Sequence, residues 1–370
     1  MSDRENFPYT FVAPGIADLR PYQPGKPIEE LERELGIVNA VKLASNENPL
    51  GPSPAAMAAL TESLGQLERY PDANGFELKA ALAAQLDVMP EQITLGNGSN
   101  DVLDLLARCF ALPQSEVIFS KYAFLVYHLI TKAAGAVPIV VPANAWGHDL
   151  TEMQSAVTDR ARMVFIANPN NPTGTYLSAD ALLEFLQQIP ANIIVVIDEA
   201  YYEYVSKKDY SSMLAYLQQF PNLVITRTFS KVYGLAGLRI GFSVSSIEIA
   251  DLLNRVRQPF NVNVVAQDAA LAALLDPEHV SRSVESNQKQ MEKLVQSCEK
   301  LGLPYIDSEA NFLTVEFGAK AADVYQALLR KGVIVRPIEN YGMPDHLRIT
   351  IGRAGEMDRL IATLPEVLAG

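Results

Sequence analysis

The chain has 370 residues, 49% of them hydrophobic and 20% charged, which is the composition of an ordinary globular protein. Its 30 basic and 43 acidic residues give a net charge of −13, which argues against nucleic acid or an anionic membrane as a partner. The first thirty residues contain no apolar signal-peptide core, and no run reaches the roughly 18 apolar residues of a membrane span, so we expect a cytoplasmic protein.

The length exceeds that of one ordinary domain and predicts two. The start of the chain, "FVAPGIADLRPYQPGKP" at 11–27, is rich in proline and lacks the pattern of a hydrophobic core. We therefore expect residues 1–40 to form a segment lying across another surface, as a lid near the small domain. Residues 41–275 are expected to form a large domain and residues 276–370 a smaller one.

Short runs rich in β-branched residues alternate with helical patterns from about residue 90. The run "NIIVVIDEA" is apolar at nearly every position before its acidic end, which is typical of a strand covered on both faces of a mostly parallel sheet. We expect an open α/β sheet with crossover helices, which binds ligands beyond the carboxyl ends of its strands. The predicted strands lie at 91–96, 116–120, 137–142, 162–168, 192–200 and 222–228.

The last hundred residues follow a different pattern. Helices are expected from about 277 to 301, near 320–331 and at the end of the chain. Strands are expected at 311–317, 333–338 and 347–352. This mixture predicts a separate α+β domain.

Four motifs fall at the ends of predicted strands: "GNGSND" (96–101), "NPNNPTG" (168–174), "DEAY" (198–201) and "TRTFSKVYGLAGLRIGF" (226–242). Each alone is a weak indication. A glycine-rich turn before a helix offers backbone N–H groups to an anion, yet such turns also merely cap helices. Asp198 is more informative, because a carboxylate that ends a buried strand needs a partner.

Together, the motifs meet the requirements of one cofactor. A lysine that attacks an aldehyde must reach its neutral form against an ordinary pKa of about 10.4, and Lys231 stands alone among hydroxyl groups. A buried aspartate keeps a pyridine nitrogen protonated. Donors suited to a phosphate are found at Ser99, Asn100, Thr228, Ser230 and Arg239. This set is what a pyridoxal-phosphate enzyme requires.

In this order and spacing, the four motifs resemble the fold-type I aminotransferases, which use pyridoxal 5'-phosphate, over nearly the whole chain. The stretches "RPYQPGKP" (20–27), "LASNENPLGP" (43–52), "RYPD" (69–72) and "HLRITIG" (346–352) resemble the histidinol-phosphate aminotransferase family in particular. The resemblance implies a large domain with a mostly parallel central sheet flanked by helices, and a smaller α+β C-terminal domain.

The resemblance also implies roles for single residues. Lys231 would bond to the cofactor aldehyde and carry a proton between substrate and cofactor, and Asp198 would pair with the pyridinium nitrogen. Tyr201 and Asn171 would hydrogen-bond the phenolate oxygen. Tyr122 would stack on the pyridine ring; core packing is the alternative for this residue.

The cofactor phosphate is expected to be held by a further group of residues in the same family. The backbone of Gly98, Ser99 and Asn100 would donate to it, together with the side chains of Ser230, Arg239 and, as a second-rank contributor, Thr228. Tyr70 would reach the same phosphate from a neighbouring subunit. The resemblance therefore implies an active homodimer.

Substrate choice is expected to depend on the C-terminal domain. In relatives that act on amino acids, the arginine matching Arg348 binds the α-carboxylate. Histidinol phosphate has a phosphate instead, which needs more donors, so the resemblance implies Arg348 assisted by Arg336, with Tyr22 closing over them. Tyr22 as a mere interface residue stays an alternative. The imidazole end would lie near Asn46 and Glu47.

The resulting hypothesis is amino transfer between L-histidinol phosphate and 2-oxoglutarate in histidine biosynthesis. An aromatic amino-acid aminotransferase and a threonine-phosphate decarboxylase remain alternatives. A regulator that uses the same fold as a sensor is disfavoured, because it needs an attached DNA-binding module and this chain has no basic segment for one. No metal site is expected, because Cys109, Cys298 and the four histidines have no ligand spacing. Trp146 is interpreted as a loop anchor.

Overall fold

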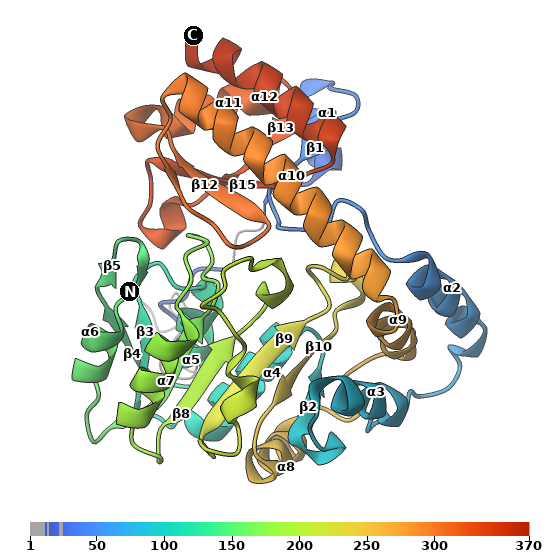
Figure 1. The fold of residues 1–370 in the computed structure, drawn as a ribbon, viewed down its shortest axis with the longest axis vertical. Helices are drawn as coiled ribbons and strands as arrows, with labels where there is room; N and C mark the ends of the chain where they lie inside the picture. Colours follow the sequence, from blue (N-terminus) through green and yellow to red (C-terminus); the bar gives the residue numbers. More distant parts are fainter. Residues whose placement is uncertain (1–11, 13–14, 22–24, 370) are drawn as a thin grey trace, which may run out of the picture.

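The computed structural model of the chain describes residues 12, 15–21 and 25–369. Two units are visible in Figure 1, a large α/β domain below and a smaller domain, drawn in orange and red, above it. The expected α/β architecture is confirmed.

A central sheet of seven strands, counted over the described residues, organises the large domain. Strand β10 runs antiparallel to both of its neighbours, and the other pairs are parallel, so the sheet is mostly parallel as expected. The strands, in spatial order, are β2 (Ile93–Gly96), β10 (Gly241–Val244), β9 (Leu223–Thr228), β8 (Ile194–Asp198), β7 (Ala161–Ala167), β3 (Glu116–Ser120) and β4 (Val137–Val141). Strand β10 has no counterpart among the predicted strands, because its four residues directly follow the loop of the last motif.

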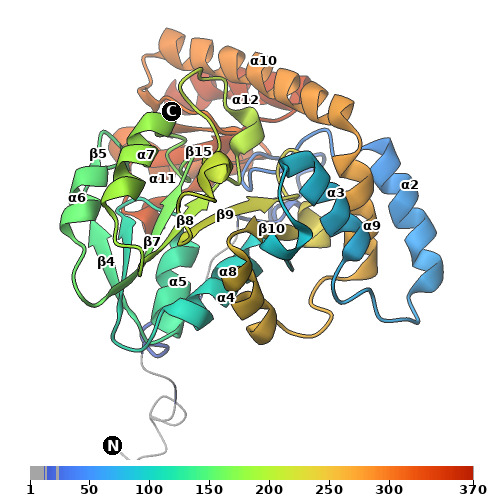
Figure 2. The same ribbon diagram turned by 60° about the horizontal axis from the view of Figure 1, so that its bottom comes forward.

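Successive residues of a strand point to opposite faces, and β8 shows how this sequence fills both. Val195 and Ile197 join one apolar cluster, while Ile194 and Val196 join the other. Helices α4 (Ser99–Phe110), α5 (Leu125–Ala133) and α8 (Ile247–Val256) cover the second face and come forward together in Figure 2. The remaining large-domain helices are α2 (Pro54–Ser63), α3 (Phe76–Leu86), α6 (Leu150–Ser155), α7 (Ala179–Gln188) and α9 (Val264–Leu274).

The small domain has its own core beneath its helices. Its sheet has the order β11 (Tyr305–Ile306), β12 (Phe312–Glu316), β15 (His346–Thr350) and β14 (Arg336–Pro337). The helices are α10 (Pro277–Leu301), α11 (Ala321–Arg330) and α12 (Ala354–Ala369). The bounds of α10 agree with the helix expected from the sequence at 277–301.

The N-terminal part of the chain packs on the small domain, beside it in Figure 1. Helix α1 (Ile28–Leu35) contributes Leu31 to an apolar cluster with Leu329 and Ile334. Strand β1 (Val41–Lys42) then pairs in parallel with β13 (Val333–Ile334). These contacts therefore extend past residue 40, where we expected the large domain to begin.

Candidate active site

A cavity of about 300 Å³ lies where the carboxyl ends of β7, β8 and β9 meet the small domain. This is the edge at which open α/β sheets bind ligands. Most of the residues that the sequence singles out line it: Asn46, Ser99, Asn100, Asn171, Asp198, Tyr201, Thr228, Ser230, Lys231, Arg239, Arg336 and Arg348. The four motifs, which are spread over residues 96–242 of the sequence, thus converge on one space.

Asp198 is the last residue of β8 and is buried. Its Oδ2 accepts a hydrogen bond from the Tyr127 hydroxyl at 2.9 Å, and Oδ1 has no hydrogen-bond partner among the described residues. Burial raises the pKa of this carboxyl, and the polar groups of Tyr127, Thr226 and the Ala200 backbone counteract that effect. A desolvated carboxylate with one oxygen to spare is suited to a cationic N–H partner in the cavity.

The hydroxyl of Tyr201 is oriented by the loop that precedes the large domain's first helix. Asn46 Nδ2 donates to the Tyr201 hydroxyl oxygen at 2.8 Å. Asn46 is itself held by Thr350, whose Oγ1 donates to Asn46 Oδ1 at 3.1 Å and accepts from its backbone N–H at 2.9 Å. Because the Tyr201 oxygen already accepts a bond, its own O–H is the group left to donate to a ligand.

Asn171 and Arg348 form a contact between the two domains. Arg348 Nη1 donates to Asn171 Oδ1 at 2.5 Å, and Nη2 donates to the Ala44 carbonyl at 2.9 Å. The guanidinium carbon also lies 5.2 Å from the centre of the Phe312 ring. With its oxygen occupied, the Asn171 side chain presents its NH₂ group as a donor.

One end of the cavity has the features of a phosphate site. Helix α4 begins at Ser99, so its first backbone N–H groups and its dipole face the cavity. Gly98 has a φ of 87°, and a Cβ there would lie 2.3 Å from Arg239 Nη2. Arg239 Nη1 donates to Ser230 Oγ at 3.3 Å. Gly98 therefore stands behind the guanidinium and lets it approach the helix end closely.

Lys231 enters the cavity from the loop after β9. Its Nζ donates to the Ser45 carbonyl at 3.4 Å and lies 5.6 Å from the centre of the Tyr201 ring. The amine is thus on the same side of the cavity as Tyr201 and the segment 44–47.

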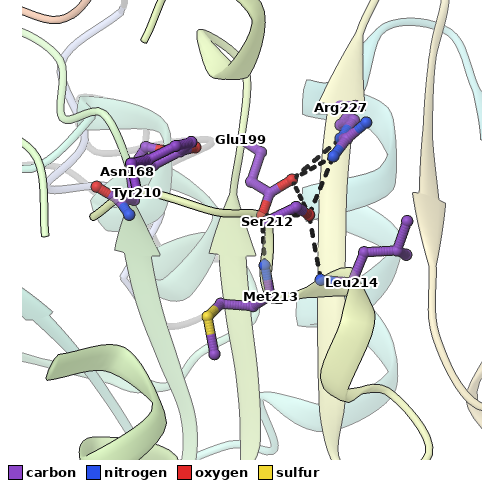
Figure 3. A network of polar contacts seen from close by, with 7 residues as sticks. All are labelled: Asn168, Glu199, Tyr210, Ser212, Met213, Leu214 and Arg227. Carbon is purple, nitrogen blue, oxygen red and sulfur yellow. Dashed lines mark hydrogen bonds and ion pairs between the residues drawn. The ribbon is translucent and has the colours of Figure 1, made fainter. Parts of the chain in front are cut away.

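Glu199, which follows Asp198, belongs to a buried polar network shown in Figure 3. Its carboxylate accepts bonds from Arg227 Nε and Nη2 at 3.0 and 2.8 Å, from the Ser212 hydroxyl at 2.8 Å and from the Met213 N–H at 3.0 Å. A buried ion pair with satisfied oxygens fixes geometry even where its net stabilisation is small. It fastens the loop after β8 to strand β9.

Two strands of the small domain bring arginines to the opposite wall. Arg336 on β14 and Arg348 on β15 are cross-strand partners, and both are buried. Side chains of directly opposed residues lie on the same face of a sheet, and like charges there repel. An anion in the cavity would relieve this repulsion.

Three expected site residues do not line the cavity. Tyr122 is not among the residues that line the cavity: its backbone turns at a φ of 64°, and its ring lies 5.2 Å from that of Trp146. Phe124, two residues later, lines the cavity instead. Tyr70 is 81% exposed and stacks on Phe260. Gly98 contributes from behind Arg239, as described above.

Tyr22 lies outside the described residues, so its predicted role is not tested. Nearby, Gly25 reaches the cavity.

Sequence reasoning missed Phe124 and Tyr127. Tyr127 is fully buried, stacks on Phe165 with centroids 4.7 Å apart, and donates to Asp198. The stretch "YAFLVY" has three aromatic residues, but its spacing does not tell which of them faces the sheet edge. Tyr127 lies in α5, between β3 and β4, more than seventy residues before Asp198, so no local pattern links the two residues.

The residues fit the cofactor that the sequence resemblance implies. Asp198 Oδ1 is a buried acceptor that awaits a donor, and the cradle at Gly98 leaves no room for a Cβ. Among the described residues, no group of three or more His, Cys, Asp or Glu side chains is placed to hold a metal ion. None of the described helices combines the length and the apolar character that crossing a membrane would need.

Known proteins resemble this chain along nearly its whole length. Residues 38–364 match the family model described as aminotransferase class I and II. Histidinol-phosphate aminotransferase 1 of Mannheimia succiniciproducens is 54% identical, over 96% of this chain and 97% of its own. Histidinol-phosphate aminotransferase 1 of Nitrosococcus oceani is also 54% identical, over 98% of both chains.

Solved structures agree with this. Histidinol-phosphate aminotransferase from Sinorhizobium meliloti in complex with pyridoxal-5'-phosphate superposes with a TM-score of 0.90 at 29% identity, covering 97% of this chain and 98% of its own. A Thermus thermophilus aspartate aminotransferase, at 21% identity and a TM-score of 0.83 over 95% of this chain and 98% of its own, shares the fold. The chain therefore belongs to the class I and II aminotransferase family, as its four converging motifs indicate.

Proposed function

We propose that this protein binds pyridoxal 5'-phosphate and transfers an amino group between L-histidinol phosphate and 2-oxoglutarate, a step of histidine biosynthesis. Support comes from the relatives named histidinol-phosphate aminotransferase, which are 54% identical over nearly the full length, and from the structural neighbour that contains the cofactor. The observation that carries the substrate assignment is the buried arginine pair of the small domain.

In this proposal, the large domain holds the cofactor. Bound pyridoxal 5'-phosphate supplies an electron sink for the charge that develops on the substrate carbon, and it carries the amino group between the two substrates. Asp198 would accept the ring N–H through Oδ1, and Phe124 would cover one face of the ring in the role expected of Tyr122. The N-terminus of α4, Ser230 and Arg239 would hold the phosphate, with Thr228 supporting Ser230 through its 3.1 Å bond from the Ser230 N–H.

Three polar side chains would then control the proton chemistry. Tyr201 would donate its O–H, and Asn171 its NH₂ group, to the phenolate oxygen of the cofactor. Lys231 would bond to the cofactor aldehyde and, once displaced by substrate, its Nζ would take the proton from the substrate carbon and return it on the cofactor side.

The small domain would bind the substrate phosphate. A phosphate monoester carries between one and two negative charges near neutral pH, and two guanidinium groups offer it more donors than one. Arg336 and Arg348 stand opposite each other on β14 and β15, facing the cavity. In the second half of the cycle, the carboxylates of 2-oxoglutarate or glutamate would use the same donors.

We also propose a cytoplasmic homodimer in which Tyr70 completes the phosphate site of the other subunit. Tyr70 is 81% exposed and stacks on Phe260, which is also exposed. Leu67 and Phe76, close to Tyr70 in the sequence, are exposed as well. A large aromatic residue in such surroundings is typical of an interface.

A half-reaction tests the proposed function. The holoenzyme is mixed with histidinol phosphate in the absence of 2-oxoglutarate, and the absorption of the cofactor aldehyde is followed. We expect its conversion to the amine form, and a much slower conversion with unphosphorylated histidinol. No conversion by histidinol phosphate would reject the proposal. Faster conversion by phenylalanine or tyrosine would favour an aromatic aminotransferase, and carbon dioxide release from phosphothreonine would favour a decarboxylase.

A further inference from the structure

The hairpin formed by β5 (Ala143–Asn144) and β6 (Gly147–His148) has an unusual turn. Its two central residues, Ala145 and Trp146, both have positive φ, at 44° and 68°. Two-residue turns of this kind are normally built from Asn and Gly, because a Cβ is unfavourable there. The sequence thus holds its single tryptophan in a conformation that costs free energy, so a compensating contact is required.

That contact is made with the small domain. The Trp146 ring lies 5.0 Å from the ring of His346 in an edge-on arrangement and 5.2 Å from that of Tyr122. Trp146 and Tyr122 also pack against an apolar cluster that joins the two domains. From the large domain come Tyr122, Leu125 and Trp146, and from the small domain Ile306, Ile338 and Met343.

The small-domain partners of Trp146 adjoin both arginines of the cavity. His346 and Arg348 are two residues apart on β15, so their side chains lie on the same face of the strand. Ile338 lies two residues after Arg336. A contact that fixes His346 and Ile338 therefore also fixes the distance between the two guanidinium groups and the large domain.

The other end of the hairpin is anchored beside the cofactor site. His148 Nε2 donates to the carbonyl of Ala167, which lines the cavity, at 2.8 Å. Asn170, the residue before Asn171, donates from Nδ2 to the Tyr122 carbonyl at 3.1 Å. The hairpin thus spans from the end of β7 to the small domain along one side of the cavity.

We propose that the hairpin 143–148 is an interdomain latch, in which Trp146 is a positioning residue that sets Arg336 and Arg348 at the right distance from the cofactor site. This inference rests on the proposed function, because the phosphate end of the substrate is what the latch would place. Trp146 touches neither substrate nor cofactor, and it acts through His346.

The test compares Trp146→Ala, Trp146→Phe and wild type as holoenzymes. Binding of inorganic phosphate is measured by titration calorimetry, and KM and kcat are measured with histidinol phosphate. We expect Trp146→Ala to raise both the phosphate Kd and the KM about tenfold, within the usual range of coupling between sites. The kcat and the cofactor absorbance should stay near those of wild type. Trp146→Phe, which keeps an aromatic ring, should restore most of the affinity.

Two further measurements support the result if the Trp146→Ala variant fails to fold or if turnover cannot be measured. His346→Gln removes the contact from the other domain and should raise the phosphate Kd to a similar extent, whereas Val140→Ala, on the exposed edge strand β4, should leave it unchanged. Because the chain has one tryptophan, phosphate binding should also change the wild-type fluorescence.

An unchanged phosphate Kd in both Trp146→Ala and His346→Gln would overturn the latch. Wild-type enzyme that binds phosphate but does not convert histidinol phosphate would overturn the proposed function alone, since the calorimetric comparison still decides the role of the hairpin.

Discussion

Arg336 and Arg348 stand directly opposite each other on antiparallel strands, buried in the wall of one cavity. Two opposed cations are unfavourable in a sheet unless an anion joins them. A carboxylate clamp needs one arginine, whereas a phosphate makes use of two. In the proposed function, the pair is therefore the feature that would distinguish a phosphorylated substrate from an amino acid.

Arg336→Ala is expected to lower kcat/KM for histidinol phosphate by roughly thirtyfold, because about 2 kcal/mol is lost when one partner of a charged hydrogen bond is removed. The rate with phenylalanine should change little, since Arg348 still binds the carboxylate. Arg330→Ala serves as control, because Arg330 ends α11 on the surface. An equal loss for both substrates would contradict a phosphate role for Arg336.

Asp198→Asn should lower kcat by about two orders of magnitude or more, as expected when a group that stabilises transition-state charge is removed. The amide no longer keeps the pyridine nitrogen protonated. Tyr127→Phe removes only the 2.9 Å hydrogen bond to Asp198 and should raise the activation free energy by about 1 kcal/mol. Steady-state kinetics of the two variants check this order. A larger effect at Tyr127 than at Asp198 would contradict the assignment.

Gly98→Ala should weaken binding of the cofactor, since the new Cβ would lie 2.3 Å from Arg239 Nη2 at a φ of 87°. The guanidinium must then move away from the N-terminus of α4. Gly355→Ala is the matched control, because a Cβ at Gly355 meets nothing within 4 Å. Equilibrium dialysis against pyridoxal 5'-phosphate measures the effect, and equal affinities in the two variants would count against the phosphate site.

Stability should depend on pH through His148. Burial lowers its pKa to about 4, whereas an unfolded histidine titrates near its ordinary value of about 6.5. As pH falls between these values, the unfolded state binds a proton that the native state does not, so stability decreases. Over the whole interval between the two pKa values, the free energy of unfolding falls by about 3 kcal/mol.

His148→Gln keeps a donor for the Ala167 carbonyl and removes this titration. Urea unfolding at fixed protein concentration between pH 7 and pH 4 should show a steeper loss of stability in wild type than in the variant. Parallel curves would show that folding does not lower the pKa of His148.

The sequence allowed the order of strands and helices to be predicted because their patterns are local. The run "IIVVI" is apolar on both faces, and the structure indeed divides its residues between two clusters. The polar helix at 277–301 was equally clear. Strand β10 was missed, since it is only four residues long and one of its two partners, β2, lies far away in the chain.

The site was predicted where a motif fixes a residue type at a strand end, as at Asp198 and Lys231. It stays a prediction for the ring that would stack on the cofactor, because two aromatic residues stand close together there. Which of Tyr122 and Phe124 faces the cavity depends on the left-handed backbone at Tyr122, and no local pattern announces that turn in a tyrosine. Phe124 lines the cavity, while Tyr122 packs against the interdomain cluster.

The central claim is that Lys231 carries pyridoxal 5'-phosphate in the cavity bounded by Asp198 and the two arginines. The holoenzyme is reduced with borohydride and digested, and its peptides are mapped by mass spectrometry. We predict one pyridoxyl adduct, on the peptide that contains Lys231 and on its ε-nitrogen. An unmodified Lys231, or an adduct on another lysine alone, would contradict the account.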